Sequence, residues 1–85
     1  MIKFAADLSP YMPIDREKAT LIAAAAGRFQ CTLTLENNGI VLNIKSMIGL
    51  LSQSIPKDGK MTLIADGEDE EAAAKELKKL IGEKA

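Results

Sequence analysis

No histidine occurs among the 85 residues, so the sequence has no imidazole to act as a general base, bind a metal or carry a phosphoryl group. Tryptophan is also absent, and aromatic residues make up only 4% of the chain. The 11 basic residues are balanced by 12 acidic ones. With neither a surplus of positive charge nor a set of stacking side chains, we expect no nucleic-acid partner.

Cysteine is equally scarce. Cys31 is the single one, so it can form neither an internal disulfide nor a zinc cluster, and we expect a buried structural thiol in a reducing compartment. Asp7 interrupts the first apolar residues, and the longest apolar run, Ala19–Gly27, is shorter than the roughly 18 to 20 residues that span a bilayer. The sequence therefore predicts a cytoplasmic protein with no membrane partner, metal or cofactor.

The remaining composition is that of a globular protein, with 47% apolar and 27% charged residues. This length suits one small domain over residues 1–85. Alternation of apolar and polar residues predicts four strands. Asn37-Asn38-Gly39 predicts a hairpin, because Asn and Gly accept the positive φ of a type I′ turn. The expected strands cover residues 4–8, 31–36, 40–44 and 61–65, and the third has Ile40, Leu42 and Ile44 on its core side.

Three helices are expected between these strands. The first covers residues 16–27, with Asp15 as its N-cap and a buried face of Ala19, Ile22, Ala23 and Ala26. A short helix, Met47–Leu51, follows Ser46, and a long one follows Gly67 with Glu68, Asp69, Glu70 and Glu71 in its first turn. Its expected buried stripe is Ala73, Leu77, Leu80 and Ile81. This order predicts an antiparallel sheet with the long helices on one face and Thr32, Thr34, Asn43 and Thr62 on the other.

Four features at matching spacing make the chain resemble the HPr-type phosphocarrier proteins of the bacterial sugar phosphotransferase system. They are Phe29 after the first helix, Asn38-Gly39 in the hairpin, Lys45-Ser46 before the short helix and Gly67-Glu68-Asp69-Glu70 before the long one. The resemblance covers the whole chain. It implies an α+β open-faced β-sandwich of order βαββαβα, with a four-stranded antiparallel sheet and helices on one face.

The family carries its phosphoryl group on a histidine in a His-x-Arg-Pro motif at the start of the first helix. Ungapped placement puts Asp15 at the histidine, Glu17 at the arginine and Lys18 at the proline. A shift of one residue instead puts Ile14 at the histidine and Arg16 at the arginine. In both placements the phosphoacceptor ring is missing.

Lys45-Ser46 keeps a second motif of the family, in which an ATP-dependent HPr kinase phosphorylates the serine. A catabolite-repression homologue within the family also lacks the histidine, keeps the serine and, when phosphorylated, binds a LacI-type catabolite control regulator. The resemblance therefore implies a non-catalytic regulatory protein, phosphorylated at Ser46, whose partners are HPr kinase and such a regulator, or components of the phosphotransferase system. From the residues alone, a plain N-cap is the favoured role of Ser46, and only the resemblance makes the regulatory role its equal.

Asp15 has three alternative roles. It can cap the helix, it can present a fixed negative charge where relatives carry phosphohistidine, or it can accept a phosphoryl group as an acyl phosphate. Arg16 and Lys18 oppose the helix dipole, so they are either merely solvated or attract an anionic partner.

The short helix cannot bury all its apolar residues. We expect Met47, Leu50 and Ile55 to suit the core, and Ile48 and Leu51 to face outward beside Ser46. The expected partner-binding residues are Arg16, Lys45, Met47, Ile48 and Leu51. The leading hypothesis is a regulatory docking protein without enzymatic turnover. The alternatives are a phosphoryl carrier that uses Asp15, and a docking module that is never phosphorylated.

Overall fold

A computed structural model describes residues 1–12, 14–46, 50–51 and 58–82, and every structural statement below concerns these residues. The elements follow one another as β1 (Ile2–Asp7), a 3-10 turn η1 (Ser9–Tyr11), α1 (Arg16–Gly27), β2 (Thr32–Asn37), β3 (Ile40–Asn43), β4 (Lys60–Asp66) and α3 (Glu70–Ile81). Of the predicted short helix, Leu50 and Leu51 are described and are helical, whereas Met47, Ile48 and Ile55 lie outside the described residues.

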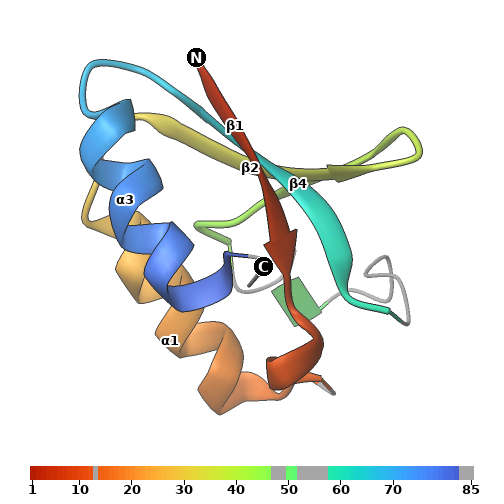
Figure 1. Cartoon of the computed structure of the whole chain (residues 1–85). Coiled ribbons are helices and arrows are strands. Elements are labelled where there is room, and N and C mark those ends of the chain that lie inside the picture. Colours follow the sequence, from red (N-terminus) through yellow and green to blue (C-terminus); the bar gives the residue numbers. More distant parts are fainter. Residues whose placement is uncertain (13, 47–49, 52–57, 83–85) are drawn as a thin grey trace.

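The four strands form one antiparallel sheet in the order β1-β4-β2-β3. Figure 1 shows α1 and α3 side by side on one face of this sheet. The α+β open-faced sandwich predicted from the sequence is therefore confirmed. The hairpin is confirmed as well, because Asn38 and Gly39 have φ values of 50° and 84° between β2 and β3.

The core lies between the sheet and the helices, and its residues follow the predicted periodicities. The buried residues of α1 are Ala19, Ile22, Ala23 and Ala26, all four as expected from helical spacing. In β4, Met61, Leu63 and Ala65 are buried in strict alternation, and Cys31 is 3% exposed. Tyr11 connects the loop before α1 to α3, because its hydroxyl donates to the Leu80 carbonyl at 2.6 Å.

Three details of the predicted elements are wrong. Ile40 is in phase with buried Leu42 but is 40% exposed, because it lies next to the turn that projects past the helices in Figure 1. Leu80 is only half-buried, at the margin of the stripe. The last helix begins at Glu70 with Asp69 as N-cap, so Glu68 and Asp69 precede its first turn.

Candidate functional site

The start of α1 is built around Asp15. Its backbone is extended, and its side chain accepts a hydrogen bond from the Lys18 amide at 2.9 Å. The Asp15 carbonyl accepts from the Ala19 amide at 2.9 Å, which closes the first turn. Asp15 is therefore an N-cap, the first of its three predicted roles. The side chain is also exposed, so its charge faces solvent.

An exposed apolar residue that was not among the predicted site residues lies on the next turn. Leu21 is 52% exposed and, with Glu17, Lys18 and Thr20, lines a shallow hollow on α1. Arg16 is exposed at the beginning of the same helix. The helical spacing could have indicated its exposure, because Leu21 does not share the face of the buried residues Ala19 and Ile22. This end of α1 thus presents both charge and an apolar side chain.

Lys45 lies toward the opposite end of α1. Its ammonium group donates to the Phe29 carbonyl at 2.7 Å, just beyond the helix, and its backbone amide donates to Asn43 Oδ1 at 3.0 Å. The 12 residues of α1 extend about 18 Å, so Lys45 and Asp15 belong to different ends of the helix. The half-buried Lys45 side chain thus fastens the turn after β3 to the end of α1.

Ser46 stands where a helical turn starts. Its amide donates to the Asn43 carbonyl at 3.0 Å, and its own carbonyl accepts from the Leu50 amide at 3.1 Å. The second bond has the i to i+4 spacing of an α-helix, as expected for a capping position. Leu50 is 1% exposed and belongs to the core, whereas Leu51 is 43% exposed. The predicted inward and outward positions of these two leucines are confirmed.

The Asp69 carboxylate binds the backbone between α1 and β2, an arrangement called the Asp69 clasp below. Its two carboxylate oxygens accept from the Gln30 and Cys31 amides, each at 2.8 Å. The bond from the Gln30 amide is the main reason why the pKa of Asp69 lies below its ordinary value. Burial, and then the adjacent Asp69 carboxylate, raise the pKa of the Cys31 thiol to about 11, which makes it a poor nucleophile at neutral pH.

This clasp predicts a pH-dependent contribution to stability. Because the pKa of Asp69 is lowered by folding, its contribution is complete above the ordinary pKa of aspartate and is lost as pH falls through the folded value. Asp69→Asn should therefore lower the urea midpoint at neutral pH, and the difference from the unsubstituted protein should shrink below about pH 4. Glu68→Gln, which removes one nearby charge, is the matched control. Equal effects of the two substitutions would contradict the clasp.

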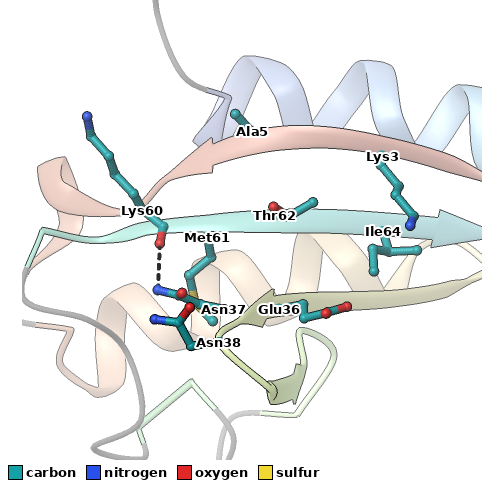
Figure 2. Close-up of a pocket in the computed structure, with 9 residues that line it drawn as sticks. All are labelled: Lys3, Ala5, Glu36, Asn37, Asn38, Lys60, Met61, Thr62 and Ile64. Carbon is teal, nitrogen blue, oxygen red and sulfur yellow. Dashed lines mark hydrogen bonds between the residues drawn. The ribbon is translucent and has the colours of Figure 1, made fainter.

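A second hollow lies on the open face of the sheet, away from α1. Figure 2 shows it between the β2–β3 hairpin and strands β1 and β4, with Lys3 and Lys60 well apart and Glu36 and Asn38 on the hairpin side. The Asn37 side chain donates to the Lys60 carbonyl across it at 3.2 Å. The predicted open-face residues Thr32, Asn43 and Thr62 are exposed and Thr34 is half-buried. Of the predicted site residues that the structure describes, none lines this hollow.

The predicted site residues thus form two regions. Asp15 and Arg16 lie at the start of α1, and Lys45, Ser46 and Leu51 follow β3, while Met47 and Ile48 lie outside the described residues. Within the described ranges, no group of three or more Cys, Asp or Glu side chains could hold a metal ion. No helix in this part of the chain is long and apolar enough to cross a membrane.

Comparison with known proteins agrees with this geometry. Residues 14–83 match the family model described as "PTS HPr component phosphorylation site". The chain is 38% identical over 64 residues, 75% of either sequence, to the HPr-like protein Crh of Bacillus subtilis (strain 168).

Two solved structures have the same fold. The crystal structure of HPr-C-His from Thermoanaerobacter tengcongensis superposes with a TM-score of 0.83 at 27% identity, over 95% of this chain and 91% of that one. The solution structure of Crh, the Bacillus subtilis catabolite repression HPr, gives a TM-score of 0.69 at 32% identity, over 99% and 98% of the two chains. Because the family model covers residues 14–83 and the relative in Bacillus subtilis is 38% identical, the chain belongs to the HPr family of the phosphotransferase system.

Proposed function

We propose that this protein is a non-catalytic, regulatory member of the HPr family that acts by binding protein partners and is switched by phosphorylation at Ser46. The observation that carries the proposal is the pairing of a missing phosphoacceptor histidine with a retained Lys45-Ser46 turn. Ser46 begins a helical turn whose Leu50 is held in the core and whose Leu51 is exposed. A modification there can be recognised without unfolding the protein.

Phosphorylation would act on the surface of this turn. The γ-phosphoryl group of ATP is transferred to Ser46 Oγ, the hydroxyl loses its proton, and ADP leaves. The product adds about −1.5 to −2 charge. Helix-terminal amides favour such an anion by only about 0.3–1 kcal/mol, which is too little to remodel the fold. One charge-assisted hydrogen bond from a partner's arginine contributes about 1.5–3 kcal/mol, so the partner supplies most of the effect.

The kinase reaction tests the switch. Incubation with ATP and HPr kinase should add one phosphoryl group by intact-mass measurement, and Ser46→Ala should remain unmodified. The phosphorylated form should then bind a LacI-type catabolite control regulator more tightly than the unmodified form, as measured by titration calorimetry. An unmodified Ser46, or equal binding of the two forms, would remove the switch from the proposal.

The second candidate function is a phosphoryl carrier that uses Asp15. One observation favours it: the Asp15 carboxylate is exposed at the start of α1, where the ungapped placement puts the family's histidine. Against it, the carboxylate is already the N-cap acceptor for the Lys18 amide at 2.9 Å. An acyl phosphate would place a bulky dianion on the group that closes the first turn of α1. In the docking role, Asp15 remains an unmodified N-cap.

The partners in this proposal are proteins, contacted through Arg16 and Leu21 on α1 and through Leu51 after Ser46. Arg16 supplies positive charge, and the two leucines supply apolar area, 52% and 43% exposed. Lys45 supports the region of Leu51 by fastening the turn after β3 to Phe29. A cytoplasmic location and the absence of enzymatic turnover are parts of the same proposal.

A further inference from the structure

Within the described residues, the edge formed by β3 is short but carries no charge, no proline and no second paired strand. Residues 37–44 contain no charged side chain and no proline. In the described part of the chain β3 pairs on one side only, with β2. Two large apolar side chains on it face solvent, Ile40 at 40% and Val41 at 59% exposure. Natural proteins usually protect such an edge with charge, proline or a covering segment, because it can pair with another strand.

The other edge of the sheet, β1, is protected. Lys3 and Asp7 place charges on that strand. Gly82, at the end of α3, forms an antiparallel bridge with Ala6 on its outer side. The Met1 ammonium group also pairs with Glu70 at 2.6 Å, which ties the start of β1 to α3. The two edges therefore differ, and among the described strands β3 is the edge that lacks both charged side chains and a bridge on its outer side.

The hydrogen-bonding groups of β3 define how a strand would pair with it. Ile40 closes the hairpin opposite Asn37, and the Ile44 amide donates to the Leu33 carbonyl at 3.1 Å. Because bonded positions alternate along an antiparallel pair, Val41 and Asn43 direct their amides and carbonyls away from β2. The Asn43 carbonyl already accepts from the Ser46 amide at 3.0 Å. The groups available for a new strand centre on Val41.

A second copy of the same strand fits this pattern. With a two-fold axis at Val41, the two Val41 residues exchange amide-to-carbonyl bonds, and each Asn43 amide meets the Gly39 carbonyl of the other copy. The Asn43 carbonyl keeps its hydrogen bond from the Ser46 amide, so it needs no donor from the other copy. In the same register Ile40 lies directly opposite Leu42 of the other copy, on the face that carries the helices. The contact would bury Ile40, which is in phase with the core yet 40% exposed.

We propose that β3 is a self-pairing edge, through which two copies of this chain associate antiparallel in a two-fold register centred on Val41. A net charge of −1 leaves little repulsion between copies. Four strand residues bury much less than the roughly 1,200 Å² of a stable interface, so the dimer is transient and forms only at high concentration. The inference is independent of phosphorylation at Ser46.

Sedimentation velocity over a concentration series up to about 1 mM tests the proposal, since weak complexes have dissociation constants in this range. The unsubstituted protein should sediment increasingly as a dimer. Val41→Lys should weaken the dimer about tenfold or more, because it places like charges opposite each other at the axis. Leu21→Lys is the matched control, since it replaces a similarly exposed apolar residue on α1 and should leave the dimer intact. Circular dichroism checks that both variants fold.

Mixed samples of ¹³C-labelled and unlabelled protein report the register. Intermolecular nuclear Overhauser effects between the Ile40 and Leu42 methyl groups are the expected result. The proposal is overturned by a monomer at every concentration, by loss of the dimer in Leu21→Lys, or by a dimer that Val41→Lys leaves unchanged. The last outcome would identify strand exchange or another surface as the cause of association.

Discussion

Leu50→Ala should lower the free energy of unfolding by about 2–5 kcal/mol, the usual cost of removing a fully buried leucine side chain and leaving a cavity. Leu50 is 1% exposed and belongs to the hydrophobic core. Its amide also donates to the Ser46 carbonyl at 3.1 Å, so the same residue anchors the turn that carries the proposed phosphorylation site. Urea denaturation followed by circular dichroism measures the loss.

The neighbouring Leu51 provides the matched control. It is 43% exposed, so Leu51→Ala should change the free energy of unfolding by no more than about 0.5 kcal/mol. If Leu51 contributes to docking, the same substitution should weaken binding of the protein partner while stability is unchanged. A similar loss of stability in both variants would show that the segment does not have the described inward and outward sides.

Gly67→Ala should cost about 1–3 kcal/mol, the range found when an extra methyl group is forced into a packed site. Gly67 has a φ of 153°, which side chains rarely adopt, and an added Cβ would lie 2.6 Å from Cys31 Cβ. Its amide also donates to Glu70 Oε1 at 3.3 Å. The strain would therefore fall on the contact between the start of α3 and the entry to β2. A thermal melt should show a clearly lower midpoint.

Gly27→Ala is the comparison for this variant. Gly27 is the last residue of α1, and a Cβ built there has no neighbour within 4 Å. Alanine also restricts the unfolded chain, so this substitution should be neutral or stabilising by up to about 1 kcal/mol. If both glycine substitutions destabilised equally, the close approach of Gly67 to Cys31 would not be the cause.

The sequence predicted those parts of the fold that depend on local periodicity. Helical spacing identified Ala19, Ile22, Ala23 and Ala26 as the buried face of α1 because burial and the 3.6-residue repeat coincide there. Ile40 was assigned to the core by its phase alone. Its exposure depends on how far the hairpin projects beyond the helices, which no local pattern records.

Contacts between distant residues were beyond prediction for the same reason. The acidic run before α3 was interpreted as a dipole signal, yet Asp69 binds the Cys31 amide, 38 residues away along the chain. Lys45 was assigned to partner binding, and its ammonium group bonds to Phe29. Asp15 was predictable, because capping depends only on the residues that follow it.

The central claim is that this family member is recognised by partners but relays no phosphoryl group. The most direct measurement incubates the protein with labelled phosphoenolpyruvate and the first enzyme of the phosphotransferase system, beside a histidine-containing HPr as positive control. The account predicts no label on this protein while the control is labelled. A hydroxylamine-sensitive adduct that is lost in Asp15→Asn, with onward transfer of phosphate to a sugar permease component, would contradict it.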